Sequence, residues 1–209
     1  QYTPVGGGHN WRDITMSSDG TKLAVIARNS AYIYTSSNSG ANWVERYTGF
    51  EEHWHRITSS ADGTKLAAVV MLGNIWTSTD SGATWTEDTS VGSTKNWRDI
   101  TMSSDGTKLA AVVNGGNIWT SNDSGATWTV DTSVGATKSW QTITSSANGE
   151  KLTAVTWNQG IWISNDSGAT WTQDGSTSIK GGKITSSADG TKLAATAYQG
   201  NIWTKIEGI

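Results

Sequence analysis

The sequence has no cysteine, a single proline and a single phenylalanine. Without cysteine the fold contains no disulfide bond, and no metal site can be built on thiolates. This absence leaves the cellular compartment open, because it excludes stabilising bridges and says nothing about redox conditions.

Charge is also scarce. Charged residues make up 16% of the chain and the formal net charge is −3, so no basic surface of the kind that binds nucleic acid or anionic membranes is expected. No apolar run approaches the roughly 18 residues of a membrane helix, so membrane insertion is not expected either. No leader peptide is present, and Gln1 is typical of a mature N-terminus rather than of a translation start. We therefore expect a secreted, extracellular protein.

Tryptophan and glycine are abundant instead, with thirteen Trp and 24 Gly. Serine and threonine are plentiful as well, while hydrophobic residues make up only 35% of the chain. This composition is typical of many short strands joined by tight turns and packed by large indole side chains.

An internal repeat organises the chain. Trp11, Trp54, Trp97 and Trp140 follow one another at intervals of 43 residues, and Gly181 takes the same place in a fifth, shorter unit. Each unit predicts four short strands, such as 97–102, 108–113, 117–120 and 127–131 in the third. Four antiparallel strands in about 43 residues is the size of one propeller blade. No helical periodicity supports a helical solenoid.

The first turn of every unit is Asp-Gly or Asn-Gly. The five pairs are Asp19-Gly20, Asp62-Gly63, Asp105-Gly106, Asn148-Gly149 and Asp189-Gly190. Such pairs predict a type I′ hairpin, in which both central residues have positive φ.

A second turn follows the pattern Ser-x-Asp-x-Gly-x-Thr-Trp. It occurs at residues 78–85, 121–128 and 164–171, and in weaker form at 36–43, where Asn38 replaces the aspartate. We expect the Asp side chain to cap N–H groups two residues on, the Gly to supply positive φ, and the Trp to anchor the turn. The pattern resembles the Asp-box, or BNR repeat, of sialidase-type propellers. The structural residues of this motif are Asp80, Gly82, Trp85, Asp123, Gly125, Trp128, Asp166, Gly168 and Trp171.

These features predict an all-β fold, a single five-bladed β-propeller of four-stranded antiparallel blades over residues 1–209. The predicted blades are 11–53, 54–96, 97–139, 140–180, and 181–209 completed by 1–10. The last unit ends after its third strand, so we expect residues 1–6 to supply its outer strand and close the ring. Pro4 fits an outermost strand, where a missing N–H is tolerated.

The units differ most in the loops after their second strands and beside their first tryptophan. Aromatic, amide and arginine side chains gathered there suit sugar recognition, since rings stack on apolar sugar faces while amides and guanidinium groups bind hydroxyls. Alternatively, these loops vary because nothing constrains them, and the first-strand tryptophans are core. The candidate ligand-binding residues are Trp11, Arg12, Trp54, Arg56, Trp97, Arg98, Asn114, Trp140, Trp157 and Tyr198.

Catalysis and metal binding are not expected. The resemblance to sialidases implies an arginine triad, a Tyr–Glu pair, an acid–base Asp and an Arg-Ile-Pro motif. Here Arg-Ile-Pro is absent, and every arginine lies in the first half of the chain. No pair of carboxylates can be placed across a glycosidic bond. One carboxylate per turn is too few for calcium, and His9, His53 and His55 match no zinc spacing. We expect no enzyme activity, no metal and no cofactor.

Two functions remain. The layout resembles five-bladed tachylectin-type lectins, which implies repeated weak glycan sites strengthened by multivalency. The first hypothesis is therefore a non-catalytic carbohydrate-binding propeller, with its sites on the face opposite the Asp-boxes. The alternative is a structural or protein-interaction module of a larger extracellular assembly, because one fold serves many functions. The similarity of the units also fits a recently duplicated or engineered array.

Overall fold

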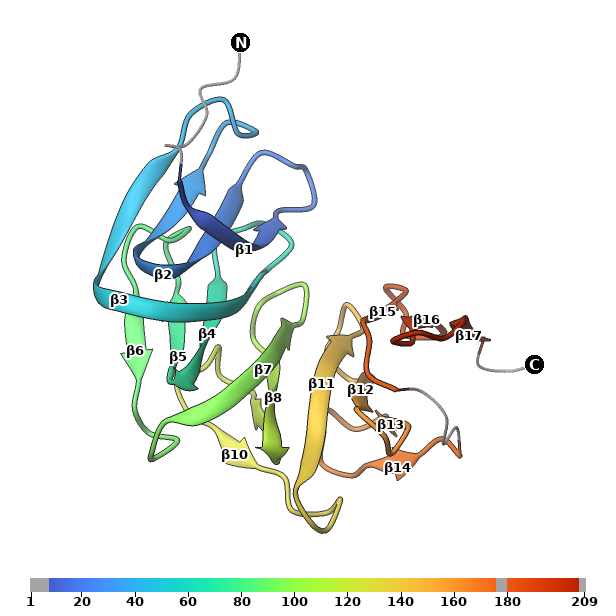
Figure 1. Cartoon of the computed structure of the whole chain (residues 1–209). Helices are drawn as coiled ribbons and strands as arrows, with labels where there is room; N and C mark the ends of the chain where they lie inside the picture. The colour runs from blue at the N-terminus through green and yellow to red at the C-terminus, as the bar shows by residue number, and fades with distance from the viewer. Residues whose placement is uncertain (1–7, 176–179, 207–209) are drawn as a thin grey trace. The chain divides into compact units, whose positions relative to one another are not determined.

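The computed structural model describes residues 8–175 and 180–206, and within these ranges it contains seventeen β-strands and no helix (Figure 1). The all-β class predicted from the sequence is confirmed. The predicted closing strand at residues 1–6 lies outside the described residues. The chain divides into two compact units, Gln1–Trp97 with Ser104–Gly106 and Arg98–Ser103 with Thr107–Ile209, and each is described by itself.

The first unit is built from antiparallel strands, most of which pair with the next strand along the chain. Its strands are β1 (Asn10–Met16), β2 (Leu23–Ser36), β3 (Val44–Ser59), β4 (Leu66–Gly73), β5 (Ile75–Ser78), β6 (Thr86–Asp88) and the start of β7 (Lys95–Met102). Strands β2 and β3 are long because each covers two successive strands of the sequence prediction. The first half of β2 pairs with β1 and its second half with β3, whose second half then pairs with β4.

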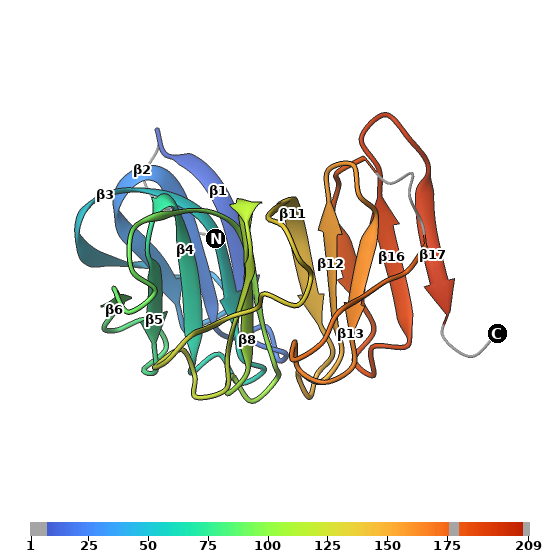
Figure 2. The same cartoon turned by 90° about the horizontal axis from the view of Figure 1, so that it is seen from below.

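The second unit repeats the same arrangement. Its further strands are β8 (Leu109–Gly116), β9 (Ile118–Ser121), β10 (Thr129–Val130), β11 (Lys138–Ser145), β12 (Leu152–Thr156), β13 (Ile161–Ser164), β14 (Thr172–Gln173), β15 (Ile184–Ser186), β16 (Lys192–Thr196) and β17 (Ile202–Ile206). Strands β11 to β14 form one four-stranded antiparallel sheet, and β15 to β17 form a three-stranded sheet beside it (Figure 2).

The second strands of the three inner repeats, β4, β8 and β12, form the centre of the core. The five residues Leu66 to Val70 at the start of β4 are all buried, as are the five of β12. Continuous burial explains their nearly unbroken apolar sequence, since both faces of the strand are covered. Tryptophans pack beside them, with Trp54 edge-on to Trp76 at a centroid distance of 5.8 Å and Trp140 edge-on to Trp162 at 6.2 Å. This edge-to-face arrangement is the favoured one for aromatic pairs.

The Asp-Gly turns differ from the type I′ hairpins that the sequence predicts. Positive φ is found at the glycine, 71° at Gly20, whereas Asp19 is not among the described residues with positive φ. Gly20 N donates to Ser17 O, and Asp19 Oδ1 accepts hydrogen bonds from Ser17 Oγ and Thr21 N. The prediction was wrong about the aspartate because its carboxylate caps the turn from an ordinary φ, leaving only the glycine to reverse the chain.

The eight-residue turns at 78–85, 121–128 and 164–171 share one hydrogen-bond pattern. In the middle turn Asp123 Oδ1 accepts from Ser121 Oγ at 2.8 Å and Thr127 N at 2.9 Å, and Oδ2 accepts from Thr127 Oγ1 at 2.6 Å. The aspartate thus caps an N–H four residues on, rather than the predicted two. The turn is wider because Ser124 and Gly125 both have positive φ, 61° and 88°.

The first and third of these turns pack closely on a strand of the repeat before them. A Cβ placed on Gly82 would lie 2.7 Å from Thr35 Cγ2, and one on Gly168 would lie 2.7 Å from Thr120 Cγ2. Glycine is therefore required by the close approach as well as by φ. Trp171 is buried and donates its Nε1–H to Gly168 O, whereas Trp85 and Trp128 are half-buried. The aspartates of the motif hold the turn and the tryptophans anchor it.

Candidate functional site

The first-strand tryptophans divide into buried and exposed members. Trp54, Trp97 and Trp140 are 0% exposed, and the Nε1–H groups of Trp54 and Trp97 donate to Ser30 O and Gly73 O. An indole with no face to solvent offers no plate for a sugar ring, so these three act here as core residues. Trp11 is different, since it is 42% exposed and lies edge-on to Tyr34 at 5.1 Å.

The candidate arginines are engaged in contacts within the fold. Arg12 Nη2 lies 2.8 Å from Nε2 of the buried His55, which connects β1 to β3. Arg98 Nε and Nη2 both lie 3.4 Å from Gln141 Oε1, which connects β7 to β11. Arg56 Nη1 donates to His55 O. The guanidinium groups of Arg12 and Arg98 tie neighbouring first strands together, and these two arginines hold the same place in the first and third repeats.

Two of the predicted ligand-binding aromatics meet in space. Trp157 follows β12 and Tyr198 follows β16, and their ring centroids lie 5.7 Å apart with an interplanar angle of 38°. The side chains are 39% and 59% exposed. Their loops also carry exposed amides at Asn158, Gln159 and Gln199. We call Trp157 and Tyr198 the aromatic pair. Asn114, at the same place in the unit before, is half-buried at the end of β8.

Gly181 makes room for the aromatic pair. A Cβ on Gly181 would lie 2.2 Å from Trp157 Cε3, so any other residue would displace the indole. Tyr198 N donates to Lys180 O and Gly181 O, and Trp157 N donates to Ser139 O, which fixes both loops. The sequence shows the signal for this device, because Gly181 stands where the earlier units have tryptophan. The reason for the glycine is the contact with Trp157, which only the structure shows.

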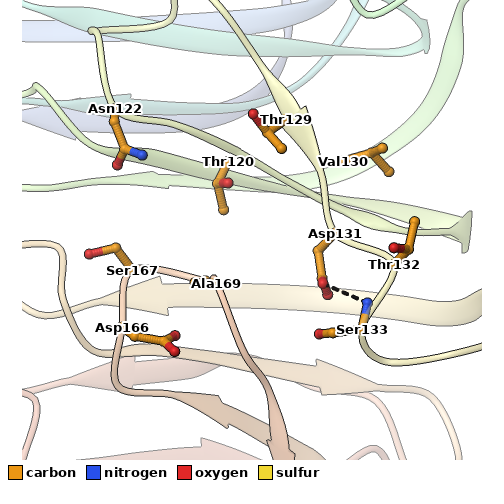
Figure 3. Close-up of a pocket in the computed structure, with 11 residues that line it drawn as sticks. Thr120, Asn122, Thr129, Val130, Asp131, Thr132, Ser133, Asp166, Ser167 and Ala169 are labelled. Carbon is orange, nitrogen blue, oxygen red and sulfur yellow. Dashed lines mark hydrogen bonds between the residues drawn. The ribbon is translucent and has the colours of Figure 1, made fainter.

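A groove in the second unit was not predicted. It has a volume of about 410 Å³ and lies between β10, the segment 131–133 that follows it, and the turn 166–169 (Figure 3). Asp131 lies in its wall and is only 7% exposed. Its Oδ1 accepts from Ser133 N at 2.8 Å, whereas its buried Oδ2 has no hydrogen-bond partner among the residues described. The sequence carried one signal, the recurrence of Asp88, Asp131 and Asp174 every 43 residues.

Metal sites and membrane spans are not found in the part of the chain that the structure describes. It brings together no group of three His, Asp or Glu side chains able to hold an ion. Both carboxylate oxygens of Asp80, Asp123 and Asp166 are occupied by hydrogen bonds from their own turns. Within the same residues, no helix has the length and hydropathy to span a membrane.

Solved structures with a similar fold are numerous. YCF48 from Cyanidioschyzon merolae matches with a TM-score of 0.69 and 14% identity over 100% of this chain and 70% of its own. A nidogen/laminin complex matches with a TM-score of 0.70 and 13% identity over 95% of this chain and 76% of its own. An ancestral GH74 enzyme matches with a TM-score of 0.67 and 15% identity over 94% of this chain, which spans only 28% of that enzyme.

No protein-family model matches the chain, and no curated sequence does. Identities this low show the fold alone. The structural neighbours are β-propeller proteins, so the repeated antiparallel sheets of this chain have the β-propeller fold. They include glycoside hydrolases and non-enzymatic propellers, so fold does not decide the activity.

Proposed function

We propose that this chain is a non-catalytic, lectin-like propeller whose carbohydrate site is centred on the aromatic pair. The observation that carries the proposal is the contact between Trp157 and Tyr198, two half-exposed rings 5.7 Å apart on neighbouring loops. Two tilted ring faces form a shallow apolar plate on which the C–H face of a sugar can stack. The amides of Asn158, Gln159 and Gln199 then supply donors and acceptors for hydroxyl groups.

Absence of catalysis belongs to the same proposal. Arg12 and Arg98 are committed to His55 and Gln141, and the turn aspartates to their own threonines, so neither group is available for substrate chemistry. We interpret the eight-residue turns as Asp-boxes with a structural role. The expected location is outside the cell, where glycans and matrix proteins are the ligands at hand.

The proposal predicts that binding depends on the aromatic pair and not on the buried tryptophans. Trp157→Ala or Tyr198→Ala should weaken glycan binding about fivefold to tenfold, since a stacking ring contributes roughly 1 kcal/mol. Labelled protein on a glycan array, followed by titration of the best glycan, measures the change. Trp97→Ala is unsuitable as a test because removing a core tryptophan costs roughly 3–5 kcal/mol of stability.

Tyr47→Ala is the matched control, because Tyr47 is a 66% exposed aromatic residue on β3 in the first unit, whereas the pair belongs to the second. It should bind glycan as the unaltered chain does. Absence of binding to every glycan class, or full binding by Trp157→Ala, would remove the lectin function.

A protein-interaction scaffold is the second candidate, and the propeller neighbours favour it. They include nidogen in a complex with laminin and YCF48 bound to a D1 peptide. Retention of this chain in a large ordered assembly during size-exclusion chromatography would support the scaffold. Late elution of a monomer from a sugar column would support the lectin.

A further inference from the structure

Three aspartates occupy one structural position at the end of the fourth strand. Asp131 N and Asp174 N donate to Ile118 O and Ile161 O, and Asp88 pairs with Ile75, the corresponding residue of its unit. In two of them Oδ1 caps the turn that follows, accepting from Ser90 N at 2.6 Å and from Ser133 N at 2.8 Å. One oxygen of the carboxylate therefore stabilises the chain, and Oδ2 is left for another partner.

For Asp174, in the fourth sequence repeat, that partner is a lysine of the same chain. Lys205 Nζ on β17 lies 2.5 Å from Asp174 Oδ2, with the carboxylate side chain 9% exposed. Lys205 stands three residues after Ile202, where the two preceding units have Ser164 and Ser121. The last unit thus shows how an ammonium group fits this carboxylate.

For Asp131 and Asp88 the corresponding residue of the next repeat is a serine, and Oδ2 is unpaired among the described residues. The Oδ2 atoms of Asp88 and Asp131 are buried and accept no hydrogen bond from any described residue. Leaving a buried carboxylate oxygen without a partner costs free energy. Asp131 is one of the residues that line the groove of about 410 Å³.

The residues that line the groove favour an ammonium group over other cations. Asp131 and Asp166 lie in its lining, which contains no lysine or arginine, and the nearby Lys108 Nζ lies 3.1 Å from Ser167 Oγ. A single free oxygen suits the point charge of an ammonium group better than the two-pronged guanidinium. It is too few for calcium. Val130 and Ala169 offer apolar surface for the methylene stem of a lysine.

We propose that the groove at Asp131 binds a lysine side chain of a protein partner. The Asp131 side chain turns toward the groove, and its Oδ2 then accepts from the ammonium group as Asp174 Oδ2 accepts from Lys205. The groove is larger than one lysine side chain, so it also accommodates the backbone that carries it. This site is separate from the aromatic pair and stands whether or not the chain binds glycans.

The test uses n-butylammonium chloride, which reproduces the end of a lysine side chain, titrated into the ¹⁵N-labelled full chain. The Ser133 amide donates to Asp131 Oδ1 and reports on the carboxylate. We expect a saturable, millimolar shift of the Ser133 signal that is absent with n-butanol and with sodium chloride of equal ionic strength. Asp131→Asn, which preserves the shape of the side chain, should abolish the saturable shift. No saturable shift, or the same shift in Asp131→Asn, would overturn the site.

Two further variants cover the case in which Asp131→Asn does not fold. Ala169→Lys places a lysine on the exposed turn that lines the groove, and should fill the site and abolish the response. Ala126→Lys makes the same change in the preceding turn and should leave the Ser133 response intact. Equal behaviour of these two variants would overturn the proposal.

A peptide distinguishes a protein partner from a free amine. The capped pentapeptide glycine-serine-lysine-serine-glycine should bind more tightly than n-butylammonium, and its analogue with norleucine for lysine should not bind. Binding of the peptide no tighter than that of the free amine would overturn the assignment to a protein partner.

Discussion

Asp131 and Asp174 hold the same place in successive repeats but differ in what faces their Oδ2 atoms. Asp174 pairs with Lys205, whose side chain is 35% exposed, while Asp131 Oδ2 is buried with no partner among the described residues. Asp174→Asn should therefore lower the free energy of unfolding by about 1 kcal/mol, a value moderated by solvent around the lysine. Asp131→Asn should leave it unchanged or raise it slightly, because an unpaired buried charge is removed. Urea unfolding of both variants measures the difference, and equal losses would contradict this account.

Trp11 and Trp54 show how far single residues could be predicted. They hold the same place in consecutive units, yet Trp11 is 42% exposed and Trp54 is 0% exposed. The sequence period fixes which residues correspond, but burial also depends on whether another repeat covers the strand. The sequence therefore could not separate core tryptophans from binding ones. It did name Trp157 and Tyr198 as candidates, and their meeting in space is a structural finding that leaves their role a prediction. Gly181 was not singled out, because its importance lies in a contact with an indole 24 positions before it.

At the scale of the element, the eight-residue turns make the free energy of unfolding depend on pH in the acid range. A hydrogen bond from Thr127 Oγ1, followed by those from Thr127 N and Ser121 Oγ, lowers the pKa of Asp123 from 3.8 to about 2. Hydrogen bonds from Thr170 and Ser164 lower the pKa of Asp166 to about 2 in the same way. Since the folded pKa is below the unfolded one, the stabilisation is complete above about pH 4 and is lost as the pH falls through about 2.

The turn at Ser36 supplies the control for this dependence. Asn38 replaces the aspartate there, and its Oδ1 still accepts from Ser36 Oγ at 3.0 Å and from Asn42 N at 2.8 Å. Asp123→Asn should therefore keep the turn but lose part of the fall in melting temperature between about pH 4 and 2. Circular dichroism melts at constant ionic strength measure that fall. A variant with the same pH profile as the unaltered chain would contradict the assignment.

The positions of the turns were predicted better than the hydrogen bonds that hold them. The positions of Asp-Gly pairs and of the eight-residue pattern marked the chain reversals, because glycine is needed wherever φ is positive. The hydrogen bonds were not predicted correctly, since the same aspartate can cap a turn from ordinary φ or take positive φ itself. In Asp19 and Asp123 the side chain reaches forward to Thr21 N and Thr127 N, and only the coordinates show which N–H it meets.

At the scale of the whole molecule, the first and last strands of the array expose apolar side chains. Ile14 on β1 is 56% exposed, whereas the corresponding isoleucines of later units are nearly buried, at 6% for Ile57 and 4% for Ile143. At the other end Ile202 on β17 is 77% exposed, and its counterparts Ile118 and Ile161 are 0% exposed. Each end thus presents an apolar face of the kind that inner units bury against a neighbour. Closure into five blades, which the period predicts, would cover both faces.

A double-mutant cycle of Ile14→Ala and Ile202→Ala tests that closure. If the two faces pack on one another, each single change should cost about 2 kcal/mol or more, and the pair should show a coupling of at least about 0.5 kcal/mol. If both side chains remain in solvent, each change should stay within about 0.5 kcal/mol and the two should add. Leu72→Ala, at a 67% exposed residue near the end of β4, gives the baseline.

Sedimentation separates the two ways of covering the faces, because closure within one chain gives a coupled monomer. A dimer with the same coupling would show that a second copy covers them and would contradict the five-bladed ring.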